Sequence, residues 1–391
     1  FCLTLVFLTI STLNAQAYNN KQGEVSVPSA AAFSYGKYAD IPVNQYTGTG
    51  NVGVPLFSVS DGPLSLAVGL QYHTGGIQVG TPAGAVGLGW NLNYGGMISR
   101  VIRGTADDRF AVGYYNAGTV INTSIAQDVA DGTKDAEPDV YTYTAGGYSG
   151  KFTFAADRSV KMIPQSDVKV IVDEHLNGFN KFTIITPDGT KYHYGKSSDG
   201  TREAFDYATS DNGAVGLNDR VGWHLMEIET HDSKHRIDIF YEEVGYKYTS
   251  LGSCLGVVKY RKSSGNIDTE DNCTTLTQEN RVKTVLPSRI ETPLQTIEFF
   301  SSLNRDDLDD FDSSNQARKI FKVKMTDGPN CIEYDFTQSY FESDITSGSA
   351  KRLKLDAVQK SSCVIGSTLE EPAWTFDYAG TILGNGSHFF P

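Results

Sequence analysis

VGVPLFSVSDGPLSLAVGLQYH, residues 52–73, is the stretch that decides the fold class. In its second half, Leu or Val and finally Tyr72 occupy every second position from Leu64, and small or polar residues lie between them. A period of two is typical of a half-buried β-strand. Asp61-Gly62 joins the two halves and can supply the positive φ of a type I′ hairpin turn. Because Pro55 cannot donate a ladder hydrogen bond, we expect the first strand to lie at a sheet edge or to carry a bulge.

The same succession of strand, tight turn and strand recurs along the chain. Turns at Pro187-Asp188-Gly189 and at 327–330 (DGPN) lie between aromatic or β-branched runs, and 223–243 contains two further strands across a polar loop. No stretch combines helical periodicity with helix caps. The sequence therefore predicts an all-β fold with little helix, in which an extended antiparallel meander of hairpins forms layered or twisted sheets, as in a β-sandwich or a shell.

Composition narrows the class of protein. Hydrophobic residues make up 39% of the 391 residues, well above the level typical of disordered chains. The 21 tyrosines, 20 phenylalanines and 39 glycines favour strands and turns over helices. The formal net charge of -13 argues against nucleic acid as a partner, because an acidic surface repels phosphate backbones.

The N-terminal residues 1–17, FCLTLVFLTISTLNAQA, have the apolar core and the small-residue cleavage site of a secretory signal peptide. No Met and no basic region precede Phe1, so we expect the signal peptide to be incomplete and the protein to be secreted or placed at the cell surface. No later segment approaches the roughly 20 apolar residues of a transmembrane span. We divide the rest into a leader (18–33), a glycine-rich β subdomain (34–125) and a second β region (126–391), with the boundary in the weakly patterned stretch 116–139.

Cysteines give a second expectation. Cys2 leaves with the signal peptide, and the remaining Cys254, Cys273, Cys331 and Cys363 allow three disulfide connectivities. Proximity in sequence favours Cys254 with Cys273 and Cys331 with Cys363 in an oxidising compartment. Free thiols buried in strands are the alternative. The spacings do not fit a zinc site.

The candidate catalytic and binding residues do not form a catalytic or ligand-binding motif. The sequence therefore predicts no enzyme activity, no cofactor and no metal. The acidic run 306–312 lacks the spacing of a calcium loop, which favours a solvated loop. His231 and His235 lie between predicted strands and so belong to a hairpin loop, and His73 ends a regular strand. Aromatic residues at strand spacing (Tyr114, Tyr115, Tyr141, Tyr143, Tyr192, Tyr194, Trp374, Phe376 and Tyr378) could stack on sugars if exposed, but packing in a core is the favoured interpretation.

The glycine-rich run VGLGWNLNYGGMISR, residues 86–100, needs a separate explanation. Leu88, Trp90, Leu92 and Tyr94 share one predicted face, and the nearly bare opposite face consists of Gly87, Gly89, Asn91 and Asn93. Gly95-Gly96 then reads as the turn of a hairpin into 97–104. Because glycine in a strand often marks the close approach of another backbone, we expect the bare face to pack at close range against another sheet or strand. Gly87, Gly89, Trp90, Gly95 and Gly96 are thus predicted structural residues.

Several motifs between residues 33 and 104 occur together in order: GKY (36–38), IPV (41–43), YTGT (46–49), the strand 64–73 followed by Gly76-Ile77, and VGLGW (86–90) followed by GG (95–96). This run resembles the N-terminal region of exported RHS-repeat (YD-repeat) proteins of Bacteroidetes-type bacteria, which is related to the N-terminal region of the B component of insecticidal toxin complexes. Later segments resemble the same proteins more loosely.

The resemblance implies a non-enzymatic structural module that contributes to a β shell enclosing or presenting a C-terminal, toxin-like effector. Its partners would be the downstream RHS shell and the effector of the same polypeptide. The tyrosine-aspartate repeats, the self-cleaving RHS core and the effector of that family are absent from these residues, so we expect the protein to continue beyond Pro391.

Two alternative functions remain open from the sequence. Export, acidity and paired tyrosines would also suit a surface adhesin that binds glycans of a host or a competitor cell. A glycoside hydrolase would need two carboxylates in one cleft, and 46 acidic residues supply such pairs by chance, so the sequence does not support that activity.

Overall fold

The computed structural model describes residues 51–73, 82–117, 123–131, 133–173, 178–207, 219–251, 257–261, 267–271, 277–303, 305–341, 351–364 and 370–378. The predicted signal peptide and leader, the motifs before residue 50, Gly76-Ile77, Cys254 and Cys273 lie outside these residues. Within them the fold is all-β with antiparallel pairing, as the hairpin pattern predicts.

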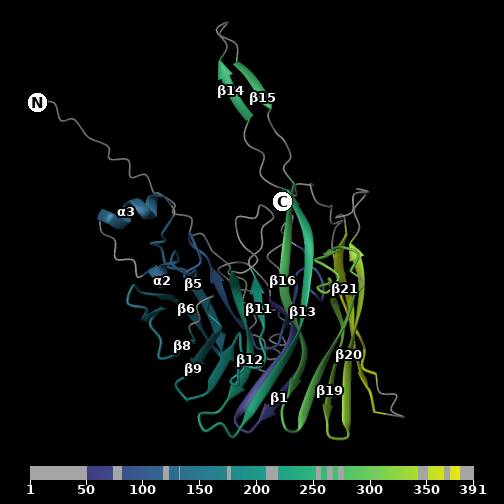
Figure 1. The fold of residues 1–391 in the computed structure, drawn as a ribbon. Coiled ribbons are helices and arrows are strands. Elements are labelled where there is room, and N and C mark those ends of the chain that lie inside the picture. Colours follow the sequence, from purple (N-terminus) through teal and green to yellow (C-terminus); the bar gives the residue numbers. More distant parts are fainter. Residues whose placement is uncertain are drawn as a thin grey trace, which may run out of the picture.

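The strands form three sheets (Figure 1). A small sheet has the order β1 (Asn51–Asp61), β2 (Leu64–His73), β3 (Trp90–Asn93), and a separate hairpin consists of β14 (Val257–Arg261) and β15 (Ile267–Asp271). All other strands belong to the main sheet: β4 (Met97–Val101), β5 (Val140–Ala145), β6 (Tyr148–Phe154), β7 (Val160–Ile163), β8 (Lys169–Asp173), β9 (Lys181–Ile185), β10 (Lys191–Tyr194), β11 (Phe205–Tyr207), β12 (Arg220–Glu229), β13 (Arg236–Leu251), β16 (Thr277–Glu291), β17 (Gln295–Ser302), β18 (Asp309–Asp310), β19 (Lys319–Asp327), β20 (Asn330–Phe341), β21 (Arg352–Ser362) and β22 (Trp374–Thr375).

Two short helices lie between β4 and β5: α2 (Tyr114–Ala117) and α3 (Thr123–Ala130). The second falls in the stretch 116–139, for which the sequence predicted no helix. It spans eight residues, and those from Ala126 to Ala130 are half-buried or exposed. At eight residues α3 makes only about two turns, too few for helical periodicity to stand out in a sequence. No helix of the described ranges has the length and apolar character needed to cross a membrane.

The hairpin of β1 and β2 confirms the alternation and corrects the turn. Leu64, Leu66, Val68 and Leu70 are all buried. A bulge follows Pro55, and in the small sheet β1 is an edge strand, as expected from that proline. Because Asp61 pairs with Leu64, the turn residues are Gly62 and Pro63. Proline cannot adopt the second positive φ of a type I′ turn. Gly62 with φ 56° in the first position instead fits a type II′ turn.

The main sheet is a meander that branches at β12. The strands β13, β16, β17, β19, β20 and β21 are successive antiparallel neighbours. The second half of β12 pairs with β13 and β10, whereas its first half pairs with β4 and β11. A further pairing between Tyr207 of β11 and Lys283 of β16 closes β11, β12, β13 and β16 into a ring. Two wings extend from β12, one through β4, β5, β6 and β7 and the other through β10, β9 and β8.

The predicted hairpin across Gly95-Gly96 is wrong. β3 pairs with β2 in the small sheet, whereas β4 pairs with β12 and β5 in the main sheet. The two glycines therefore carry the chain from one sheet to the other. A Cβ atom at Gly95 would lie 2.8 Å from Cδ2 of Leu225 and 3.4 Å from Cδ1 of Leu66, which belong to different sheets. A side chain does not fit where the chain crosses between the layers.

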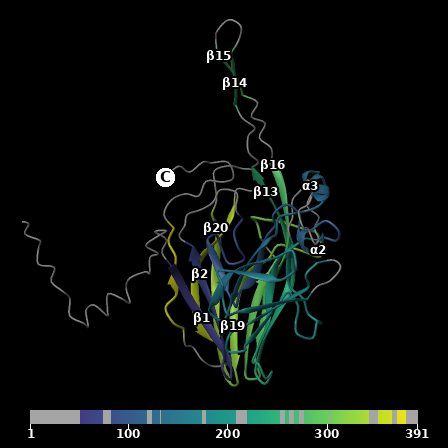
Figure 2. The same ribbon diagram turned by 90° about the vertical axis from the view of Figure 1, so that its left-hand side faces the viewer.

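One hydrophobic core joins the layers. It includes Val54 and Leu70 of the small sheet, Ile239 and Val323 of the main sheet, and the aromatic side chains between the two wings: Tyr141, Tyr143, Phe152, Phe154, Phe179, Phe182, Tyr194 and Trp223. Figure 2 shows β1 and β2 alongside β19 and β20, with α2 and α3 at the opposite side. Because the core takes residues from both sides of position 125, the two predicted regions share one core.

Candidate functional site

Residues 83–90, here called the clasp, lie against the main sheet and end at Trp90, the first residue of β3. The Ile320 N–H donates to the carbonyl oxygen of Ala85 at 2.9 Å, and the Leu88 N–H donates to the carbonyl oxygen of Leu353 at 2.8 Å. The Gln338 side chain donates through Nε2 to the carbonyl oxygen of Val86 at 2.8 Å. These bonds join the clasp to β19, β20 and β21.

The clasp glycines leave room for two close neighbours. A Cβ atom at Gly87 would lie 2.9 Å from the backbone nitrogen of Leu355 in β21. At Gly89 the backbone has φ 77°, and a Cβ atom would lie 2.7 Å from Cε2 of Tyr72 in β2. The expected close packing of another sheet or strand on the bare face is confirmed at Gly87, which is buried against β21, and is wrong at Gly89, Asn91 and Asn93, which are exposed. The close contacts are made by one backbone position and one aromatic ring.

Trp90 links the clasp to the last described segment. Its side chain is buried, and Nε1 donates to the hydroxyl of Tyr378 at 2.8 Å. That hydroxyl donates in turn to the carbonyl oxygen of Leu355 at 2.7 Å, and burial raises the pKa of Tyr378 to about 12. The Trp90 ring lies 4.5 Å from the ring of Phe376 and 5.2 Å from that of Tyr72. The tryptophan therefore connects β2, β21 and residues 376–378.

A buried ion pair holds the start of the clasp. Arg305 donates through Nε and Nη2 to the two carboxylate oxygens of Asp307, each at 2.8 Å, and both side chains are almost completely buried. Arg305 also donates to the carbonyl oxygens of Ala83 at 3.0 Å and Gly84 at 3.1 Å. The predicted solvated acidic loop is thus wrong at Asp307, whose carboxylate an arginine compensates inside the protein. The run's other aspartates, Asp306, Asp309, Asp310 and Asp312, are exposed.

A second buried charge cluster lies at the base of the segment between β4 and β5. Nη1 of Arg100 lies 2.7 Å from Oδ1 of Asp108 and 3.8 Å from Oδ2 of Asp139. The guanidinium also lies over the ring of Trp223, 5.3 Å from its centroid. Asp107 and Asp139 are fully buried. Carboxylates without solvent access cannot meet a substrate in this conformation, so the arrangement supports a structural role.

The histidines that the sequence singled out lie in separate places. His231 and His235 lie in the loop between β12 and β13, as predicted, and His73 ends β2 in an exposed position. Nδ1 of His235 lies 3.0 Å from Oδ1 of Asp61, so the β12–β13 loop contacts the β1–β2 turn. Within the described ranges, no three Asp, Glu, His or Cys side chains are grouped as metal ligands.

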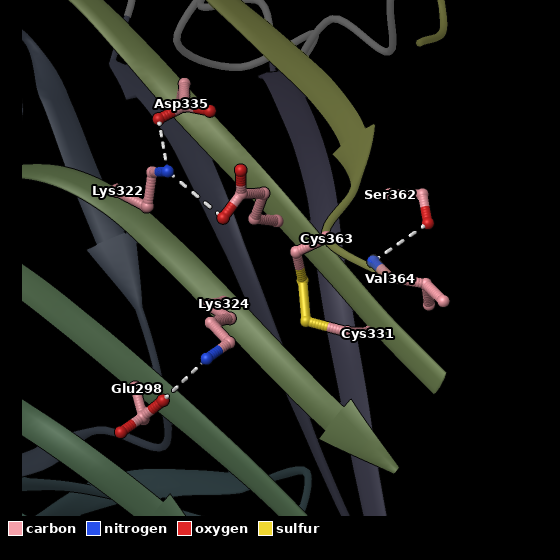
Figure 3. The surroundings of a disulfide bond; sticks show 9 residues. Glu298, Lys322, Lys324, Cys331, Asp335, Ser362, Cys363 and Val364 are labelled. Carbon is pink, nitrogen blue, oxygen red and sulfur yellow. Dashed lines mark hydrogen bonds and ion pairs between the residues drawn. A yellow bond between two sulfur atoms is a disulfide. The ribbon is translucent and has the colours of Figure 1, made fainter. Parts of the chain in front are cut away.

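Cys331 and Cys363 form a disulfide with their Cα atoms 5.0 Å apart, which is the pairing that proximity in sequence favours. The bond connects the start of β20 to the residue after β21 (Figure 3). Nearby cross-strand ion pairs join Lys322 to Asp335 at 3.1 Å and Lys324 to Glu298 at 3.4 Å (Figure 3). This end of the sheet is held by a covalent bond as well as by its ladder.

Four of the nine candidate sugar-stacking aromatics are buried core residues. Tyr115, Tyr141, Tyr143 and Tyr194 are buried, and Tyr141 stacks on Phe152 with ring centroids 5.0 Å apart. Trp374 differs, because 37% of its surface is exposed. The buried rings fit the packing interpretation and cannot form a ladder for a glycan.

Comparisons with known proteins give similarities to solved structures. No family model matches the chain, and no curated protein matches it. Among solved structures, the crystal structure of TcdB2-TccC3 is similar with a TM-score of 0.38 and 13% sequence identity. That similarity covers 82% of this chain and 16% of the other chain.

Proposed function

We propose that this chain is a non-enzymatic structural module of an exported RHS-type protein, in which it contributes to a β shell that encloses or presents a C-terminal effector. The order of the motifs between residues 33 and 104 is the reason for proposing this family. The contacts that residues 86–90 make support the structural role. The most family-like run of sequence makes the backbone and ring contacts that join the small sheet to the main sheet.

A buried ion pair supports the role of the clasp in holding the small sheet to the main sheet. Arg305 and Asp307 are buried together and hold the carbonyl groups of Ala83 and Gly84. Breaking a buried ion pair costs far more than breaking an exposed one, so the clasp is difficult to detach once it is formed. A module that closes a shell needs stable contacts of this kind between its sheets.

Limited proteolysis of the full-length protein tests the proposal. The wild-type protein should resist cleavage between this module and the downstream shell. Trp90→Ala should loosen the clasp and give the protease access to the enclosed segment. Trp374→Ala is the matched control, because that tryptophan is 37% exposed and should tolerate truncation.

Two results would count against the shell role. In the first, the module comes away freely while the remaining shell stays intact and closed. In the second, Trp90→Ala loosens the isolated module, as its own melting temperature reports, but leaves the enclosed segment fully protected in the full-length protein.

A further inference from the structure

The segment from residue 102 to residue 139 leaves and re-enters the main sheet at the same place. Val101, the last residue of β4, pairs with Val140, the first residue of β5. The described residues between them, 102–117, 123–131 and 133–139, contain α2 and α3 and are here called the excursion. Tyr115 of α2 anchors it in the core, whereas α3 buries little surface from Ala126 to Ala130, so the contacts between its two ends also contribute to its conformation.

Two buried aspartates fasten the base of the excursion. The Asp107 N–H donates to Oδ2 of Asp139 at 2.9 Å, and the Asp139 N–H donates to Oδ1 of Asp107 at 3.1 Å. Oδ1 of Asp139 also accepts the N–H of Arg103 at 2.8 Å. These reciprocal bonds, here called the brace, tie residues 103–107 to residue 139.

The charges around the brace do not balance. Arg100 of β4 is the cation that contacts it, and this guanidinium lies closer to Asp108 than to Asp139. Asp135 of the excursion faces Asp107, and Tyr141 of β5 faces both brace carboxylates. Nη1 of Arg220 in β12 donates instead to the carbonyl oxygen of Phe179 and to Oδ1 of Asn180. Several carboxylates therefore share one guanidinium.

One carboxylate oxygen of the brace, Oδ2 of Asp107, can be protonated without losing a hydrogen bond. Oδ2 of Asp107 is buried and has no hydrogen-bond partner in the described part of the chain, whereas Oδ1 accepts the N–H of Asp139. An ionised carboxylate oxygen left in this way carries a large desolvation cost, which protonation removes.

We propose that the brace is a proton-dependent latch: it is closed while Asp107 holds a proton on Oδ2, and release of that proton to solvent loosens the excursion. The latch is a property of the fold and does not depend on the shell role. It would let a change of pH open one side of the module without unfolding the sheets.

The raised pKa values of the two brace aspartates determine how the stability of the protein depends on pH. Burial, and next the charge of Asp139, raise the pKa of Asp107 to about 8, and burial raises the pKa of Asp139 to about 6. An unfolded aspartate has a pKa of about 4. Because the folded values are higher, the stabilisation is complete below about pH 4 and is lost as the pH rises to about 8.

The substitution Asp107→Asn tests the latch by fixing the neutral form. Its amide oxygen can still accept the Asp139 N–H, and its NH₂ group replaces the protonated Oδ2. Urea unfolding of the wild type and of the variant is compared from pH 5 to pH 8. The ratio of their unfolding constants should change by up to about tenfold per pH unit. As the pH rises, the wild type should become less stable relative to the variant. Asp199→Asn, at an exposed carboxylate whose pKa is low, should add no slope in this range.

Parallel pH profiles for the wild type and Asp107→Asn would overturn the proposal. If the variant does not fold, infrared spectroscopy of the native wild type decides: a buried carboxylic acid band should be present at pH 6 and should be lost as the pH rises through about 8. Its absence at pH 6 would also overturn the latch. Hydrogen exchange, corrected for the intrinsic rate, should rise in residues 103–113 above pH 8 and stay unchanged at Ile237 and Ile239. Unchanged protection at 103–113 would contradict a loosened excursion.

Discussion

Gly89 shows at the scale of one residue why the clasp requires glycine. Its φ of 77° disfavours any residue with a Cβ atom, and that atom would lie 2.7 Å from the ring of Tyr72. We expect Gly89→Val to lower the free energy of unfolding by about 2 to 4 kcal/mol, because backbone strain and overpacking add. Thermal and urea unfolding of the purified variant measure the loss.

Asn93→Ala is the matched comparison for Gly89→Val. Asn93 is exposed on the same strand face and makes one long hydrogen bond, 3.4 Å from Oδ1 to the Gly95 nitrogen. Its removal should cost less than about 1 kcal/mol. Equal melting temperatures for the two variants would show that the Tyr72 ring and the backbone conformation impose no constraint at Gly89.

At the scale of elements, the sequence predicted what neighbouring residues decide. The hairpins at Gly62, Gly189 and Gly328 could be found because turn chemistry and strand alternation are local signals. The step from β3 to β4 could not, because Gly95-Gly96 serves equally well as a turn or as a passage between sheets. Only the distant partners, β2 on one side and β12 on the other, distinguish the two.

The buried charges escaped sequence analysis for a related reason. In the sequence, Asp107, Asp139 and Asp307 look no different from the exposed aspartates of the chain, and their burial depends on Arg100 and Arg305. For Asp307 a local signal did exist, since Arg305 lies two residues away, but the same spacing is common in solvated loops. The ion pairs become recognisable only when the folded structure shows which strands cover them.

The Arg305–Asp307 pair yields a prediction at this scale. Arg305→Met leaves a fully buried carboxylate without its partner and should cost about 3 to 5 kcal/mol in urea unfolding. Lys351→Met is the control, since Lys351 pairs at 3.3 Å with Asp306 where both side chains are exposed, and it should cost less than about 1 kcal/mol. Adding Asp307→Leu to Arg305→Met should recover part of the loss. Similar costs for both single variants would mean that the buried pair does not hold the clasp.

At the scale of the whole molecule, the shared core decides how the protein unfolds. The sequence suggested a boundary near residue 125, because the chain loses its strand pattern there. The core nevertheless places Val54 and Trp90 in the same cluster as Ile239 and Trp223. Sequence patterns report where strands are interrupted, whereas cooperativity depends on which side chains pack together. The small sheet and the main sheet, which share this core, should therefore unfold as one unit.

Two single-tryptophan variants test this cooperativity. Trp223→Phe with Trp374→Phe leaves Trp90 as the probe of the first region, and Trp90→Phe with Trp374→Phe leaves Trp223 as the probe of the second. Both probes are buried, so both should shift in fluorescence on unfolding. Within each variant the fluorescence and circular dichroism midpoints in urea should coincide, as in a two-state transition. A Trp90 signal lost well before the circular dichroism signal of the same variant would instead assign the first region an independent, weaker fold.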